Sequence, residues 1–415
     1  MFNNPPLPES EDCLYLNIFT PATSTSQDKL PVLFWIHGGS FSLGSGRLPE
    51  YDGSELAANQ DVVVVTINYR LNVFGFPASP EIDAENRNLG FLDQRRALAW
   101  VSQNIHAFGG DQLKVTIFGE SAGGYSVKQL VANPPRPLPF RAAIIQSQAR
   151  GPVSDNEGAW AILAAELECN STLATESQLA CMRAASADRI RDILDHRMLA
   201  FSPTYDNMTD MLSIEDMVYK GAAAKVPILI GTNADEGTVL TPVIPAPQSM
   251  LQSIFGSNAT SLGIARQAYP ANATDEQLKS RILTDYQYTC TTSAIANTLA
   301  EAGHRVWRYY FNASFPNTQP FLGAGVWHTS EISLIFGTYS RDDLTSSQQV
   351  RLSRIFQRSW ASFAKDPYSG PGWASVGSTL NDLEALGADG TAWGQSIDKN
   401  HVDKVCEVYS GVIKV

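Results

Sequence analysis

Short apolar runs rich in β-branched residues recur along the chain and alternate with segments of helical periodicity. Most of these runs are hydrophobic almost without a break, which is typical of strands covered on both faces. They predict strands at 31–37, 61–70, 115–118, 140–148, 225–233 and 304–312. Apolar residues at helical spacing predict helices over 89–105, 125–133, 158–168, 176–196 and 348–364. Strands that alternate with helices indicate parallel crossover units and a doubly wound α/β sheet.

The organisation of the chain points to a single domain over residues 1–415. A length of 415 residues suits one large α/β domain, and the sequence has no internal repeat and no low-complexity linker. The proline-rich stretch 133–140 is expected to be a loop, and helical regions around 155–225 and 240–300 elaborate the sheet. Function in such a sheet lies at the carboxyl ends of the strands.

One strand end carries the pattern G-x-S-x-G, formed by Gly119, Ser121 and Gly123 after the strand at 115–118. In a nucleophile elbow the chain turns sharply from strand to helix, with a serine in a strained conformation at the apex. The flanking glycines leave room where a Cβ would collide with neighbouring backbone. The alternative is a Gly/Ser turn without chemistry, because this pattern alone also arises by chance.

A serine nucleophile needs a histidine base and a carboxylate that orients the histidine. Of six histidines, His328 stands in a glycine-containing loop before an apolar segment, where a loop-borne base is expected. The acid should lie between the two in the chain, at a strand end. Asp235 and Glu236 both follow the strand at 225–233, and the pattern alone does not separate them.

The loop after the first strong strand offers donors for an oxyanion. Gly38 and Gly39 follow His37 in an HGG-type loop, where main-chain N–H groups can approach a substrate carbonyl. The N–H of Ala122, directly after Ser121, supplies a third donor. The imidazole of His37 is expected to hold the turn rather than take part in catalysis.

Charge and targeting signals narrow the function classes. The net charge of −12 argues against nucleic acid and anionic membranes as partners. No apolar run approaches the roughly 20 residues that a membrane helix needs, so we expect no integral membrane segment. The first twelve residues do not resemble a signal peptide. Five N-x-S/T sequons nevertheless favour a secreted glycoprotein: Asn170, Asn207, Asn258, Asn272 and Asn312.

The chain has five cysteines, so an extracellular protein would keep one without an intrachain partner. Cys169 and Cys181 are close enough in sequence to close a small loop. Five buried thiols are the alternative that the sequence leaves open.

Several motifs together resemble the type-B carboxylesterase/lipase family, the cholinesterase-like branch of the α/β-hydrolases, in a fungal style. The similarity covers essentially the whole chain and lies in SEDCLYLNIFTP (10–21), FWIHGG (34–39), NYRLNVFGF (68–76), NLGFLDQRRALAWV (88–101), FGGD (108–111), VTIFGESAGG (115–124) and DEGT (235–238). It implies an α/β-hydrolase fold with a mostly parallel central sheet flanked by helices. In this family, ester bonds are cleaved through an acyl-enzyme intermediate without metal or organic cofactor.

The resemblance also implies roles for individual residues. It makes Ser121 the nucleophile, Glu236 the acid and His328 the base. Gly38, Gly39 and Ala122 match the oxyanion positions, and Arg70 matches the partner of Asp93 in a family ion pair. Polar positions around the histidine are matched by Glu120, Ser147 and Glu331, and the family disulfides by Cys169–Cys181 and Cys290–Cys406.

Two departures from the family pattern accompany these matches. The family's partner for Cys13 lies upstream of the first residue, so we expect the first strands of the sheet and the signal peptide to be missing from this chain. Gln148 stands where glycine is usual after Gln-Ser.

The sequence thus predicts a secreted esterase or lipase acting on small-molecule or lipid esters. A non-catalytic, cholinesterase-like binding or adhesion domain is the alternative. The oligomeric state is left open.

Overall fold

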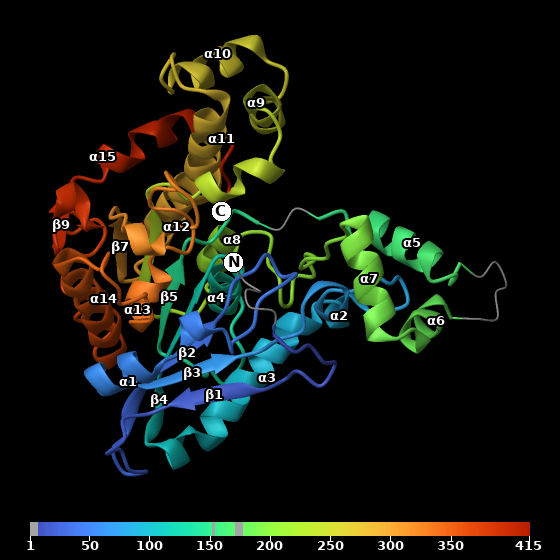
Figure 1. Ribbon diagram of the computed structural model, residues 1–415, viewed down its shortest axis with the longest axis horizontal. Helices are drawn as coiled ribbons and strands as arrows, with labels where there is room; N and C mark the ends of the chain where they lie inside the picture. Colours follow the sequence, from blue (N-terminus) through green and yellow to red (C-terminus); the bar gives the residue numbers. More distant parts are fainter. Residues whose placement is uncertain (1–6, 152–153, 171–176) are drawn as a thin grey trace.

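The computed structural model describes residues 7–151, 154–170 and 177–415 (Figure 1). Within these ranges nine strands form one sheet in the order β1-β3-β2-β4-β5-β6-β7-β8-β9. The seven inner strands are parallel, whereas β1 and β9 pair antiparallel at the two edges. The strands are β1 (Leu16–Phe19), β2 (Leu30–Ile36), β3 (Val63–Ile67), β4 (Gly110–Glu120), β5 (Ala142–Gln146), β6 (Ile228–Asn233), β7 (Val306–Phe311), β8 (Leu383–Leu386) and β9 (Gly394–Ile397).

The predicted mostly parallel α/β sheet is therefore confirmed. All six predicted strands occur, with bounds shifted by a few residues at most except for β4, which begins at Gly110. The strands β1, β8 and β9 were not predicted, because they are only four residues long and mix apolar with polar side chains.

The helices are α1 (Ser54–Gln60), α2 (Asn72–Gly75), α3 (Leu89–Asn104), α4 (Ala122–Ala132), α5 (Asn156–Glu166), α6 (Gln178–Ala184), α7 (Ala187–Arg197), α8 (Ile214–Tyr219), α9 (Pro247–Phe255), α10 (Ala259–Gln267), α11 (Asp275–Leu283), α12 (Cys290–Glu301), α13 (Ile332–Phe336), α14 (Ser347–Lys365) and α15 (Asn400–Asp403). A single helix over 176–196 is wrong, since the Ser186 side chain accepts a hydrogen bond from the Arg189 N–H and begins α7 as its N-cap. Residue 176 itself lies outside the described residues.

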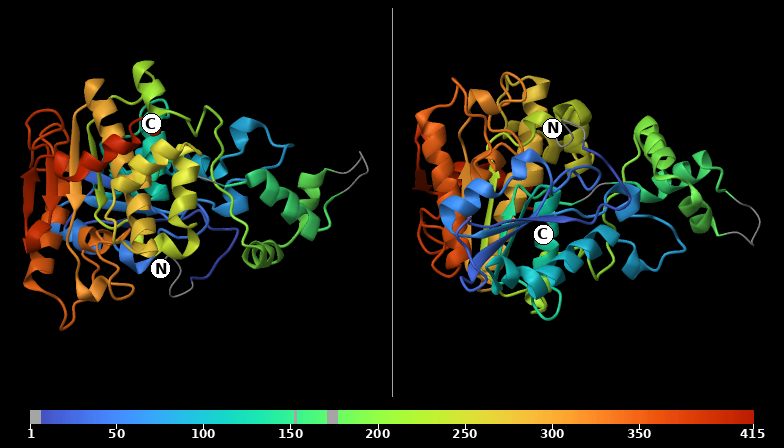
Figure 2. Two further views of the ribbon diagram at one scale, coloured as in Figure 1. Left: turned by 90° about the horizontal axis from the view of Figure 1, so that it is seen from above. Right: turned by 60° about the horizontal axis from the view of Figure 1, so that its bottom comes forward.

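Both faces of the sheet are covered by helices, as the near-continuous apolar strands require. Alternate side chains of β2 enter different cores. Phe34 and Ile36 pack in the cluster that α3, α4, α8 and α12 cover, whereas Leu33 and Trp35 pack in the cluster under α1, α13 and α14. Both helical elaborations are present. The helices α5–α7 project from one side of the sheet, and α9–α11 pack around a small apolar cluster of their own (Figures 1 and 2).

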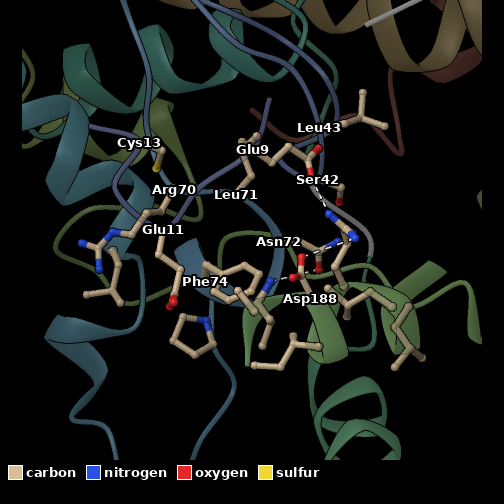
Figure 3. Close-up of a pocket in the computed structure, with 18 of the residues that line it drawn as sticks. Glu9, Glu11, Cys13, Ser42, Leu43, Arg70, Leu71, Asn72, Phe74 and Asp188 are labelled. Carbon is tan, nitrogen blue, oxygen red and sulfur yellow. Dashed lines mark hydrogen bonds and ion pairs between the residues drawn. The ribbon is translucent and has the colours of Figure 1, made fainter. Parts of the chain in front are cut away.

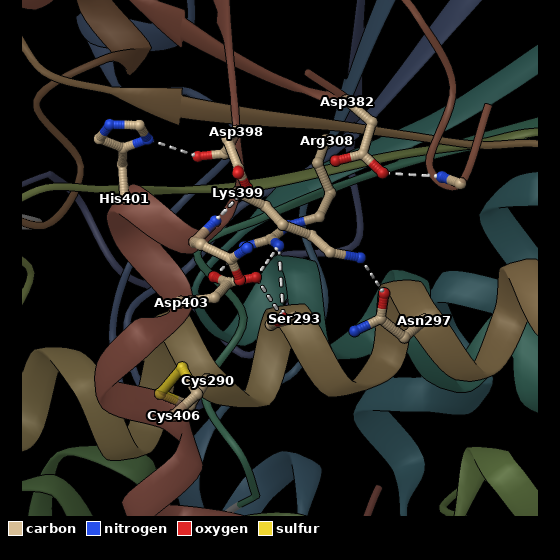
Figure 4. A network of polar contacts seen from close by, with 12 residues as sticks. Cys290, Ser293, Asn297, Arg308, Asp382, Asp398, Lys399, His401, Asp403 and Cys406 are labelled. Atoms are coloured by element: carbon tan, nitrogen blue, oxygen red, sulfur yellow. Dashed lines mark hydrogen bonds and ion pairs between the residues drawn. A yellow bond between two sulfur atoms is a disulfide. The ribbon is translucent and has the colours of Figure 1, made fainter. Parts of the chain in front are cut away.

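Two disulfides, Cys169–Cys181 and Cys290–Cys406, agree with the pairing that the family resemblance implies. Cys13 is unpaired in the described part of the chain. Near the second disulfide, the buried guanidinium of Arg308 on β7 forms two hydrogen bonds with the Asp403 carboxylate, at 2.6 and 3.0 Å (Figure 4). This ion pair and the disulfide together fasten the C-terminal segment to β7 and α12.

Within the described residues, no helix is both long and apolar enough to cross a membrane.

Candidate active site

The turn between β4 and α4 has the geometry of a nucleophile elbow. Ser121 lies at its apex with φ 57° and ψ −121°, a conformation that non-glycine residues rarely adopt. A Cβ on Gly123 would lie 1.9 Å from the carbonyl oxygen of Ile36 on β2, and one on Gly119 would lie 2.6 Å from the same oxygen. Only glycine fits at both positions, so the G-x-S-x-G pattern follows from the close packing of this turn against β2.

The structure brings Glu236 and His328 together. The carboxylate Oε2 of Glu236 lies 2.5 Å from Nδ1 of His328, and both side chains are buried. The other carboxylate oxygen, Oε1, accepts a 2.8 Å hydrogen bond from the Asn233 N–H at the end of β6. Asp235, the other sequence candidate, instead accepts a hydrogen bond from the main chain at Val326. The geometry therefore distinguishes the two neighbouring carboxylates, which the sequence pattern did not.

The second imidazole nitrogen, Nε2 of His328, lies 3.2 Å from Oε1 of Glu120, the residue before the serine. Across the described residues the hydroxyl of Ser121 makes no hydrogen bond. A Cβ added to Gly38 would lie 3.0 Å from both the Ser121 Cβ and the Glu120 Oε2. The glycine loop, the serine and the glutamate side chain therefore lie close together. Catalytic hydrogen bonds are often long or poorly aligned in unliganded sites and tighten when substrate binds.

The charges around His328 favour the protonated form of its imidazole. Burial opposes the positive charge of His328, but Glu120 and Glu236 outweigh burial and raise its pKa to about 9. Burial also raises the pKa of Glu120 well above its usual value, and the neighbouring imidazole opposes that rise. Because the two groups face each other, they titrate as a coupled pair.

The three candidate oxyanion donors lie around the elbow. Gly39 has φ +110°, and a Cβ there would lie 2.0 Å from the carbonyl oxygen of Leu43. Ala122 is the first residue of α4. The sequence reading did not single out Ser40, which has φ 54°. In the described part of the chain, no acceptor is found for the N–H groups of Gly39 and Ser40, so both are free to bind a ligand oxygen.

Of the polar positions expected around the histidine, Glu331 belongs to a hydrogen-bonded network and Ser147 does not. Glu331 accepts hydrogen bonds from Asn233 Nδ2 at 2.6 Å and from Gln146 Nε2 at 3.1 Å, and burial raises its pKa. Ser147 is buried with φ 43°, and its hydroxyl has no hydrogen-bond partner among the described residues. The structure thus does not join Ser147 to the other site residues.

Known proteins resemble this chain in sequence and in fold. The profile of the carboxylesterase family matches residues 2–403. The chain belongs to this family. Para-nitrobenzyl esterase of Bacillus subtilis (strain 168) is 36% identical over 378 residues, which cover 86% of this chain and 74% of that protein. Secreted lipase 5 of Gibberella zeae is 31% identical over 399 residues, or 88% of this chain and 70% of the lipase.

Solved structures agree with the sequence relatives. A structure of PNB esterase superimposes with a TM-score of 0.79 at 32% identity and covers 96% of this chain and 85% of the other. The predicted α/β-hydrolase fold is confirmed by this likeness and by the strand order. Membership of the family supports the predicted activity, carboxylic ester hydrolysis.

The sequence reading of this carboxylesterase-family chain missed Tyr288. It lies on a π-helical turn, Thr284–Thr289, and its ring centroid is 4.9 Å from that of His328. The hydroxyl of Thr284 on the same turn accepts a 2.9 Å hydrogen bond from the Gly237 N–H, next to the acid. This turn therefore supports both the acid loop and the base. No sequence signal marks it, because it continues a helical pattern.

The ion pair expected between Arg70 and Asp93 is present, with Nη2 and Oδ1 2.7 Å apart. Arg70 also lines a hollow of about 1200 Å³ between the main body and α5–α7, whose lining does not include the serine, the acid or the base (Figure 3). Ser42 and Leu43, which follow the oxyanion loop, form part of its wall. The hollow thus borders the candidate site without containing it.

In the ranges that the structure describes, no three His, Cys, Asp or Glu side chains are grouped so that they could hold a metal ion.

Proposed function

We propose that this chain hydrolyses carboxylic esters through the triad Ser121, Glu236 and His328. The imidazole takes the proton of the serine hydroxyl as the oxygen attacks the ester carbonyl. The resulting imidazolium, stabilised by the acid, protonates the leaving alcohol and leaves an acyl-enzyme. Water then attacks the acyl group by the same route and releases the carboxylic acid. The contact that carries this proposal is the buried 2.5 Å pair of Glu236 and His328 beside the strained elbow.

The negative oxygen of the tetrahedral intermediate is assigned to the N–H groups of Gly38, Gly39 and Ala122, and the N–H of Ser40, free within the described ranges, is a further candidate donor. Support comes from the strained glycine loop, which lies against the serine, and from the position of Ala122 at the N-terminus of α4. Glu120 would stabilise the imidazolium that forms during attack, since its carboxylate faces Nε2. Glu331 would hold the network behind the acid, whereas Ser147, whose hydroxyl has no partner among the described residues, is given a role by the resemblance to the family alone.

The proposed substrates are small-molecule or lipid esters, and the proposed chemistry needs no cofactor. Names among the relatives include an esterase and a secreted lipase, which support this substrate class. The net charge of −12 argues against nucleic acid as a partner. We assign the catalytic α/β-hydrolase domain to the whole of residues 1–415.

We further propose that the protein is a secreted glycoprotein. The two disulfides favour an oxidising compartment. The asparagines of all five sequons are exposed, as glycan attachment requires: Asn170, Asn207, Asn258, Asn272 and Asn312.

Hydrolysis of p-nitrophenyl esters of increasing acyl length tests the proposal. The wild-type protein should release p-nitrophenol, and the chain-length profile should distinguish an esterase from a lipase. Ser121→Ala should abolish turnover of every ester, whereas Ser102→Ala, which removes a hydroxyl bonded only to its own helix, should retain it. Equal activity in Ser121→Ala and wild type would refute the assignment. A folded protein without esterase activity would favour the non-catalytic binding domain.

A further inference from the structure

Asp235 directly precedes the proposed acid, yet its carboxylate turns to a different target. Oδ2 of Asp235 accepts a 2.8 Å hydrogen bond from the main-chain N–H of Val326, two residues before the proposed base. The Asp235 N–H in turn donates to the carbonyl oxygen of Val326 at 3.0 Å. Each residue therefore both donates to and accepts from the other, and the link joins the acid loop to the loop of His328.

This link has the form of a short piece of parallel sheet. Asp235 pairs with Trp327 as an isolated parallel bridge beyond the end of β6. The carbonyl of Trp327 also accepts a 3.0 Å hydrogen bond from Asn233 Nδ2, so two residues of the β6 end hold consecutive positions of the histidine loop. The backbone on the amino side of His328 is thus fixed to the strand that carries Glu236.

Gly325 shows how closely the carboxylate approaches this loop. It has φ +69°, and a Cβ at this position would lie 2.4 Å from Oδ2 of Asp235. Its carbonyl oxygen accepts a 2.9 Å hydrogen bond from Gln319 Nε2, which fastens the loop on the other side. Any side chain at 325 would push the carboxylate away from the Val326 N–H.

We propose that Asp235 is a positioning residue for the reaction. By holding the main chain at Val326, it fixes the register of the histidine loop against the acid loop, and so maintains the 2.5 Å contact between Glu236 and His328. This inference rests on the proposed function for its kinetic consequence, but the contact itself can be measured without turnover. Misplacement of a reacting group by about 1 Å can cost a hundredfold in rate.

Two substitutions of Asp235 test whether its side chain acts by accepting the hydrogen bond from the Val326 N–H. Asp235→Asn keeps an oxygen that can accept from the Val326 N–H, whereas Asp235→Ala leaves that N–H without its acceptor. We expect kcat for a p-nitrophenyl ester to fall about tenfold or more in Asp235→Ala, with KM nearly unchanged, and to be largely restored in Asp235→Asn. The matched control is Asp342→Ala, because Asp342 accepts a main-chain N–H in an exposed turn away from the site.

A second readout does not depend on activity. The short hydrogen bond between His328 Nδ1 and the Glu236 carboxylate should give a low-field proton resonance, assigned by its loss in His328→Gln. The resonance should be present in wild type, Asp235→Asn and Asp342→Ala, and absent or shifted in folded Asp235→Ala. An unchanged resonance in Asp235→Ala overturns the inference, whatever the kinetics. If wild type shows the resonance but no hydrolysis, the proposed function fails, and the spectra of the variants still decide the role of Asp235.

Discussion

The contact between Glu120 and His328 makes a specific prediction for the pH dependence of hydrolysis. Glu120→Gln keeps the shape of the side chain and removes its negative charge, which faces Nε2 of His328 at 3.2 Å. Only the neutral imidazole can take the proton of Ser121. The wild-type rate should therefore fall as the pH drops through the pKa of His328, which the neighbouring carboxylates raise.

The size of the effect follows from the distance. Two opposite unit charges 3.2 Å apart attract each other by about 5 kcal/mol at an effective dielectric constant of about 20, which corresponds to roughly four pKa units. This value is an upper limit, because burial raises the pKa of Glu120 and so keeps it protonated over part of the acid range. We expect the pKa of His328 to fall by about one to two units in the variant.

The assay is kcat/KM for a soluble p-nitrophenyl ester, measured from acid to alkaline pH so that the range spans the raised pKa of His328, about 9. The acid limb of Glu120→Gln should lie at lower pH than that of wild type, so the variant keeps a larger fraction of its maximal rate in acid. Glu331→Gln is the matched control, since this buried glutamate bonds to Asn233 and Gln146 rather than to the imidazole. Its acid limb should move less. An acid limb of Glu120→Gln that stays in place or moves to higher pH would refute the electrostatic reasoning.

Two further substitutions test the packing around the site, and a third tests the attachment of the C-terminal segment. Gly123→Ala places a methyl group 1.9 Å from a carbonyl oxygen of β2, so its free energy of unfolding in urea should fall by about 3 kcal/mol; Gly263→Ala, with no atom within 4 Å, should not be destabilised. Tyr288→Leu removes the ring beside the imidazole, and kcat should fall about tenfold, whereas Tyr288→Phe should behave like wild type; equal losses in both would mean that the hydroxyl matters instead. Arg308→Met leaves the Asp403 carboxylate without its buried partner and should cost about 3–5 kcal/mol in the same urea assay. A stability equal to wild type would show that the ion pair does not fasten the C-terminal segment.

The elements predicted correctly from the sequence are those that local chemistry determines. Buried parallel strands such as β3 are apolar on both faces, so they stand out as continuous runs. The elbow was predictable because its two glycines and the serine form one contiguous five-residue pattern after a strand, although the contact that requires Gly119 and Gly123 is with Ile36 on β2.

The features that could not be predicted depend on contacts between distant segments. Asp235 and Glu236 are adjacent and both acidic, so the pattern alone left the acid open and only the family resemblance favoured Glu236. The path of the histidine loop decides which carboxylate meets the imidazole. Tyr288 reaches His328 from a turn about forty residues earlier in the chain. The family resemblance placed Glu120 near the base, but its 3.2 Å contact with Nε2 depends on where that loop brings the ring.

The central claim is that the hydroxyl at the apex of the elbow is the nucleophile of this carboxylesterase-family protein. Treatment of the folded protein with a fluorophosphonate, followed by mass spectrometry of its peptides, tests this claim most directly. We predict one phosphonyl adduct, on Ser121, which is lost in His328→Gln although that variant keeps the serine. A folded protein that forms no adduct, or that forms it on another serine, would exclude Ser121 as the nucleophile.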